Sequence, residues 1–181
     1  PVAPLQLEKK LDCGNMMGEK KQGKGNAPHW SGKWELVVGL EVHAQLLTES
    51  KAYSSDPNAY GDRPNTLAGP VTLGLPGTLP VPNTAVIDHA IKLGLACGCT
   101  IAPRMHYARK NYFYPDLPKG YQVTQDTTPI CTGGHILITE EDGTEKAIAL
   151  TRIHMEEDAG KSIHDVDPFN TLVDLNRAGV P

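Results

Sequence analysis

The sequence predicts an α+β fold in which several short antiparallel strands accompany one clear helix. Three observations support this prediction. Several short stretches alternate apolar and polar residues, as half-buried strands do. One segment that begins after Asn83 repeats its apolar residues at helical spacing. The pair Asp142-Gly143 lies between two runs rich in β-formers, and Asp-Gly is a favoured tight-turn pair in hairpins.

The N-terminal region divides into a predicted tail and a predicted strand. Residues 1–33 are rich in Gly and Lys and show no apolar period, so we expect a disordered tail. Residues 34–181 then form the domain. The stretch "VVGLEVHAQL" at 37–46 alternates without a break, which predicts a strand with Val38, Leu40 and Val42 on one face. Glu41 and His43 share the opposite, wetter face.

The central and C-terminal elements follow in order. Residues 65–83 are full of Pro and Gly and predict a long, turn-rich loop. Asn83 can then cap a helix that ends near residues 97–99. Its predicted buried stripe consists of Val86, Ile87, Ala90, Ile91 and Leu95. We expect an irregular segment at 109–122, a hairpin at 135–156 and a further short strand within 171–181.

Composition limits the class of protein. Hydrophobic residues make up 39% and charged residues 21%, which is ordinary for a soluble globular protein. No apolar run reaches the roughly 20 residues of a membrane helix, and no signal-like segment is seen. We therefore expect a cytoplasmic protein with reduced thiols, an organelle being the alternative. Residues 34–181 hold 11 basic and 18 acidic residues, which disfavours nucleic-acid binding by charge alone and suits a divalent cation.

Three groups of polar residues are candidates for a metal or phosphate site. Glu41 and His43 would project from one strand face about 6.6–7 Å apart, although a solvated face is the alternative. The second group consists of His154, Glu156, Glu157 and Asp158. Its carboxylates are the oxygen ligands that Mg²⁺ prefers, and the alternative is an acidic turn that closes a strand. Asp174 and Asn176, again two residues apart, make the third group and could reach the same ion. Alternatively, they are ordinary polar residues at the edge of a sheet.

An aromatic and basic segment is the fourth candidate. Its basic groups and rings suit phosphates and unstacked bases, whereas a packed loop with a small core of rings is an equal alternative. The members are Arg104, Arg109, Lys110 and Lys119 with Tyr107, Tyr112, Phe113, Tyr114 and Tyr121. The sequence contains no Walker loop, no strand-linked GxGxxG, no HExxH and no spaced CxxC pair.

Longer blocks of the sequence resemble a known family. "GLEVHAQL", "LGLPGTLPVPN", "RKNYFYPDLPKGYQ", "TRIHMEEDAGK" and "LVDLNRAGVP" look like the signature blocks of GatB, one of the subunits of the glutamyl-tRNA(Gln)/aspartyl-tRNA(Asn) amidotransferase. They occur in the family's order and cover essentially all of residues 34–181. The resemblance implies an antiparallel cradle domain related to that of glutamine synthetase, of which residues 34–181 would be the N-terminal part.

The resemblance also implies an activity. Family members use ATP and Mg²⁺ to phosphorylate the side-chain carboxylate of mischarged Glu-tRNA(Gln) or Asp-tRNA(Asn), and ammonia from glutamine then displaces the phosphate. They are carbon-nitrogen ligases with glutamine as amido donor. Their partners are the amidase GatA, the small protein GatC and the mischarged tRNA. Members run well beyond "NRAGVP", so we expect a fragment cut at residue 181 that is inactive alone.

By this match Glu41, His43, Glu156 and Glu157 are the candidate catalytic and Mg²⁺-binding residues. Candidates for contact with substrate, phosphate, the tRNA end or the ammonia path are Lys110, Tyr112, Lys119, Arg152, Lys161, Asp174 and Asn176. Many members carry a CxxC where this chain has Gly69 and Thr72, so we expect no zinc. Two other functions stay open: a non-catalytic module that docks RNA or a partner, and a metal-dependent hydrolase.

Overall fold

The computed structural model describes residues 37–181 and divides the chain into two units, residues 1–44 and residues 45–181. In the first unit, residues 37–44 form neither helix nor strand, and Leu40 is 85% exposed. The strand predicted at 37–46 is therefore wrong. Alternation alone does not make a strand, because each strand needs a neighbour to complete its hydrogen-bond ladder. The tail predicted at 1–33 lies outside the described residues.

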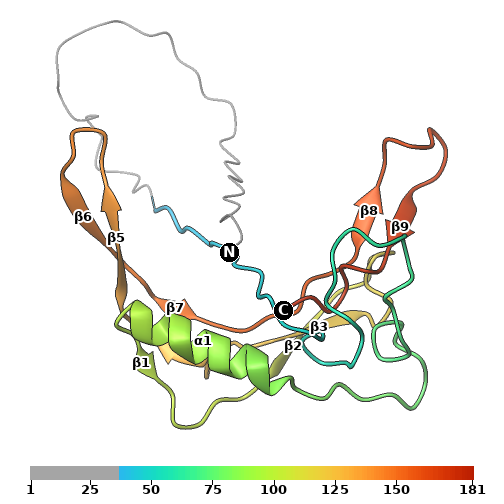
Figure 1. Cartoon of the computed structure of the whole chain (residues 1–181), viewed down its shortest axis with the longest axis horizontal. Coiled ribbons are helices and arrows are strands. Elements are labelled where there is room, and N and C mark those ends of the chain that lie inside the picture. The colour runs from blue at the N-terminus through green and yellow to red at the C-terminus, as the bar shows by residue number, and fades with distance from the viewer. Residues whose placement is uncertain (1–36) are drawn as a thin grey trace, which may run out of the picture. The chain divides into compact units, whose positions relative to one another are not determined.

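The second unit carries one helix and short strands that all pair antiparallel (Figure 1). A three-stranded sheet has the order β1-β4-β7, and the pairs β2-β3, β5-β6 and β8-β9 each form a two-stranded sheet. This arrangement confirms the α+β prediction. The elements are α1 (Thr84–Ala96), β1 (Thr100–Ile101), β2 (Ala108–Asn111), β3 (Tyr121–Thr124), β4 (Cys131–Thr132), β5 (His135–Thr139), β6 (Glu145–Ala149), β7 (Arg152–Ile153), β8 (Lys161–Ile163) and β9 (Leu172–Asp174).

The helix begins where the sequence predicts. Asn83 is its N-cap, and the Oδ1 atom of Asn83 accepts a hydrogen bond from the Ala85 N–H at 2.9 Å. The predicted buried stripe is confirmed at Val86 and Ala90 but is wrong at Leu95, which is 63% exposed. Gly94 is buried instead, and this position needs glycine because a Cβ atom there would collide with the Cys131 side chain. No helix among residues 37–181 is long and apolar enough to cross a membrane.

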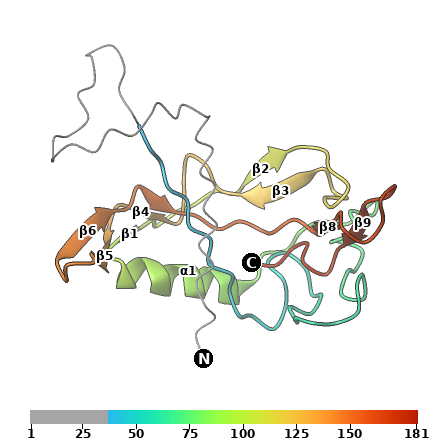
Figure 2. The same cartoon turned by 90° about the horizontal axis from the view of Figure 1, so that it is seen from above.

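Two separate clusters of buried side chains form the core. The larger cluster lies between α1 and the three-stranded sheet and comprises Val86, Ala90, Cys99, Ile130, Cys131 and Met155. The smaller cluster comprises Ala52, Tyr53 and Val123, with Tyr107 and Tyr121 packed against it. Cys97, Cys99 and Cys131 are free thiols, of which the last two are buried. In Figure 2, the β2-β3 hairpin of the smaller cluster lies on the opposite side of this unit from α1.

The hairpin predicted at 135–156 is confirmed for β5 and β6, with Gly143 at a φ of 84° in the turn. The segment 109–122 differs from the prediction. Its two ends belong to β2 and β3, and only residues 112–120 between them are irregular. The sequence hides β2 because Arg109, Lys110 and Asn111 have weak β-propensity, so the pairing with β3 decides the local conformation.

The turn-rich loop predicted at 65–83 is confirmed, and the strand predicted within 171–181 is confirmed for β9 alone. The two segments are joined through Asn65, which adopts a φ of 62°. Its Nδ2 donates to the Val173 carbonyl at 2.9 Å, and its Oδ1 accepts from the Leu175 N–H at 2.8 Å. The side chain of Asn65 thereby completes hydrogen bonds that a neighbouring strand would otherwise make.

Candidate functional site

The candidate site lies where residues 156–157 pass beside β3. β7 ends at Ile153, so the segment that follows leaves the three-stranded sheet. It is held instead by a hydrogen bond from the Glu157 N–H to the Val123 carbonyl at 3.2 Å. The two glutamates of this segment then contact different partners.

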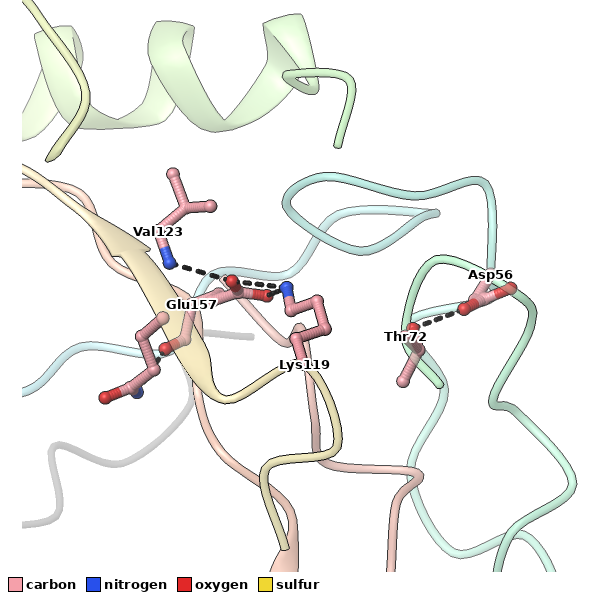
Figure 3. Close-up of polar contacts among 6 residues, drawn as sticks. Asp56, Thr72, Lys119, Val123 and Glu157 are labelled. Atoms are coloured by element: carbon pink, nitrogen blue, oxygen red, sulfur yellow. Dashed lines mark hydrogen bonds and ion pairs between the residues drawn. The ribbon is translucent and has the colours of Figure 1, made fainter. Parts of the chain in front are cut away.

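Glu157 forms a buried ion pair with Lys119 (Figure 3). The Lys119 Nζ atom lies 2.5 and 2.7 Å from the two carboxylate oxygens, and the Val123 N–H donates to Oε1 at 2.8 Å. The side chains of Lys119 and Glu157 are 6% and 3% exposed. The Glu157 carbonyl accepts a further bond from Gln122 at 2.7 Å. Both charges are thus neutralised inside the protein, and the Glu157 carboxylate is occupied by donors.

Glu156 has a wetter environment. Its Oε2 accepts a hydrogen bond from the Thr124 hydroxyl at 2.8 Å, and its Oε1 lies 4.0 Å from the Lys110 Nζ atom. The side chains of Lys110 and Glu156 are 59% and 24% exposed. Lys110 also lies over the ring of Tyr112, at 5.9 Å from its centre. Burial, followed by the charges of nearby carboxylates including Glu156, raises the pKa of Tyr112. Glu156 is thus the more exposed of the two glutamates, and its Oε1 is held less tightly than either oxygen of Glu157.

The predicted Mg²⁺ residues fit a metal unequally. Glu156 offers an oxygen to a hard cation, whereas Glu157 does not while Lys119 and Val123 occupy its carboxylate. Glu41 and His43 are exposed and belong to the first unit. Within residues 37–181 the structure groups no three His, Cys, Asp or Glu side chains around one metal position. The four-residue metal set stays a prediction.

Asp174 and Asn176 hold a neighbouring loop. The Asp174 carboxylate accepts from the Asn65 N–H at 3.1 Å and from the Asn176 N–H at 3.0 Å. Asn176 accepts from the Leu67 N–H at 2.8 Å and donates to the Arg63 carbonyl at 2.7 Å. These contacts fix residues 63–67 against the end of β9.

The other predicted residues are distributed over the surface. Arg152 is exposed and donates to the Asp126 carbonyl at 2.9 Å, and Lys161 is exposed at the start of β8. The aromatic residues of the segment fit both predictions, because some rings are packed in the core and others are exposed for binding. Tyr107 packs edge-on against Tyr53 with ring centres 5.5 Å apart, whereas Phe113 is 93% exposed.

Two polar residues at the site were not among the sequence-predicted candidates. Lys51 is fully buried, and its Nζ donates to the Leu67 carbonyl at 2.7 Å. Burial lowers the pKa of Lys51, although the charges of Asp56, Asp174 and Glu157 oppose that shift. No sequence signal identifies this lysine, because lysines are rarely buried and its neighbours show no motif.

Asp56 is the second of them, and its carboxylate joins Gly69 and Thr72 of the turn-rich loop. Its carboxylate accepts from the Gly69 N–H at 2.9 Å and from the Thr72 hydroxyl at 2.5 Å (Figure 3). A small cavity of about 170 Å³ lies between the turn-rich loop and the start of β3. It is lined by Val71, Gly74, Leu75, Thr78, Pro80, Lys119 and Tyr121.

Asp56 is expected to make stability depend on pH. Burial would raise its pKa, but hydrogen bonds from Thr72 and Gly69 outweigh burial and hold the pKa below its ordinary value of 3.8. The stabilisation is therefore complete above pH 3.8 and is lost as the pH falls through the lowered pKa. Melting temperatures of the wild type and Asp56→Asn, followed by circular dichroism, should differ most near neutral pH and converge in acid. A difference that stays constant throughout would contradict the assignment.

Comparisons with known proteins identify the family. The model of the GatB/GatE catalytic domain matches residues 36–181. A protein of Halorhodospira halophila, named as the B subunit of an aspartyl/glutamyl-tRNA(Asn/Gln) amidotransferase, is 61% identical over 149 residues, which is 82% of this chain and 31% of that protein. A protein of the same name from Anaeromyxobacter sp. is 59% identical over 148 residues, 82% of this chain and 30% of its own length.

The chain thus spans about a third of the length of these relatives. All of the described residues, 37–181, fall within the matched region, including β3, Lys119 and the segment with Glu156 and Glu157. The chain belongs to the family of GatB/GatE catalytic domains.

Proposed function

We propose that this chain serves the tRNA-dependent amidotransferase reaction as part of a GatB protein. The reaction phosphorylates the side-chain carboxylate of Glu-tRNA(Gln) or Asp-tRNA(Asn) with ATP and then replaces the phosphate with ammonia from glutamine. The observation that carries the proposal is the 61% identity to a protein named as such an amidotransferase component. Its working partners would be the amidase GatA, the small protein GatC and the mischarged tRNA, in the cytoplasm.

The proposed reaction requires positive charge close to carboxylates. A carboxylate is a poor electrophile, because its leaving group would be oxide, and phosphorylation supplies a better one. The carboxylate and the γ-phosphate are both anionic, so their approach requires positive charge. Mg²⁺, when bound, would supply that charge. The same two steps occur in glutamine synthetase, whose fold we propose for the complete cradle domain.

The exposure of each side chain indicates which ligand it would contact. The proposed ligands of the cation are those that the family match predicts, Glu41, His43, Glu156 and Glu157. Of the two glutamates near β3, Glu156 has the more exposed carboxylate. Lys110, exposed beside Glu156, would contact a phosphate. Lys119 is paired with Glu157 and would act only where that pair opens. Arg152 and Lys161, both exposed, would contact the tRNA backbone.

The experiment uses a chimera in which residues 36–181 of this chain replace the matched region of the Halorhodospira halophila relative. The chimera is assembled with GatA and GatC and given ATP, Mg²⁺ and Glu-tRNA(Gln) without glutamine. Hydroxylamine should trap the activated glutamate as a hydroxamate. We expect hydroxamate that requires ATP, Mg²⁺ and the charged tRNA together.

Other outcomes identify the alternative functions. Phosphate release from ATP without any charged tRNA would indicate a metal-dependent hydrolase. The adjacent Phe113 and Tyr114, 93% and 54% exposed, favour a docking module. Binding of tRNA, GatA or GatC, with no hydroxamate and no effect of Mg²⁺ or ATP on the melting temperature, would indicate that module.

A further inference from the structure

The turn at residues 69–74 is attached to Asp56 at one end. The Gly69 N–H and the Thr72 hydroxyl both donate to the Asp56 carboxylate, at 2.9 and 2.5 Å. Within the turn, the Leu73 N–H donates to the Gly69 carbonyl at 2.9 Å, which makes the turn one compact piece. Thr72 is buried, so water competes weakly for its hydroxyl.

The other end of the turn lies directly on Lys119. Gly74 has a φ of +66°, and a Cβ atom built there would lie 3.0 Å from the Lys119 Cα atom. Such a separation is tighter than an ordinary van der Waals contact, so the backbone of the turn packs closely on the backbone of Lys119. The turn therefore lies directly beside Lys119, the residue whose Nζ atom contacts Glu157.

These contacts form a continuous path from Asp56 to the buried ion pair. A shift of the turn away from Asp56 would withdraw Gly74 from Lys119 and open the small cavity between them. The side chain of Lys119 is 6% exposed in the present arrangement, and the loop supplies part of its cover. The contacts therefore link the half-buried Asp56 carboxylate to the loop that covers the Lys119 side chain.

We propose that Asp56 is a positioning residue for the Lys119–Glu157 pair, acting through the turn at 69–74. Asp56 holds the turn, the turn holds Gly74 against Lys119, and Lys119 stays shielded beside Glu157. The proposal concerns the geometry of this pair and is independent of the reaction that the site serves, so it can fail or succeed separately from the proposed function.

The test measures how fast acetic anhydride, used at limiting amounts, modifies Lys119 in the 181-residue chain. Digestion and mass spectrometry give the extent of acetylation at each lysine. Asp56→Ala and Thr72→Val should each increase the rate at Lys119 by about five- to tenfold, because losing a hydrogen bond raises the population of the open turn. Lys146 is exposed on β6, and its rate should not change.

Two further variants separate positioning from general loss of stability. Thr72→Ser keeps the hydroxyl and should preserve the slow wild-type rate. Ile130→Val weakens the larger core cluster, away from the turn, and should leave Lys119 equally slow. Wild-type rates in both Asp56→Ala and Thr72→Val would overturn the proposal, as would an equal increase in Ile130→Val. If Asp56→Ala does not fold, the comparison of Thr72→Val with Thr72→Ser decides.

Discussion

Replacing Glu41 or His43 by alanine in the chimera is expected to lower hydroxamate formation at least about 100-fold while tRNA binding persists. The two side chains would hold the divalent cation that lets the anionic carboxylate approach the γ-phosphate, a role that the single charge of Lys110 would not fill. Both residues are exposed, so their truncation should not disturb folding. Hydroxamate yield measures the chemistry, and filter binding of Glu-tRNA(Gln) measures the interaction with tRNA.

Glu49→Ala is the matched control, because Glu49 is also an exposed glutamate and lies close to these residues in the sequence. It should retain the wild-type yield. Unchanged phosphorylation in both Glu41→Ala and His43→Ala would remove these residues from the metal site. The site would then have to be built from Glu156 and residues that follow the matched region in the relatives.

Replacing Lys119 by methionine is expected to lower the free energy of unfolding by about 3–5 kcal/mol. Methionine fills a similar volume but leaves Glu157 as a buried charge without its cation. The side chains are 6% and 3% exposed, so water cannot take over the role of the ammonium group. Urea unfolding of the 181-residue chain, followed by circular dichroism, gives the change.

The double variant Lys119→Met with Glu157→Gln supplies the control for that experiment. Glutamine is neutral, and its carbonyl oxygen can still accept the hydrogen bond from the Val123 N–H. The double variant should therefore recover most of the stability lost in Lys119→Met. A loss below about 1 kcal/mol in the single variant would be typical of a solvated surface pair and would contradict the buried geometry.

The sequence by itself determined the features that depend on neighbouring residues. Asn83 followed by apolar residues at helical spacing was enough to predict α1, because an N-cap and one buried stripe are local properties. Asp142-Gly143 between β-rich runs predicted the β5-β6 hairpin for the same reason. The long signature blocks also identified the family, which the comparisons confirm.

Only the tertiary structure decided how distant polar residues pair. Glu156 and Glu157 are adjacent in the chain, yet one contacts Thr124 and the other Lys119. Asp56 and Lys51 were not predicted at all, because their partners Thr72 and Leu67 are brought to them by the folding of the loop. The alternating stretch at 37–46 formed no strand, although its local pattern was regular. Long-range hydrogen bonds and ion pairs depend on which segments meet, and residue spacing along the chain does not contain that information.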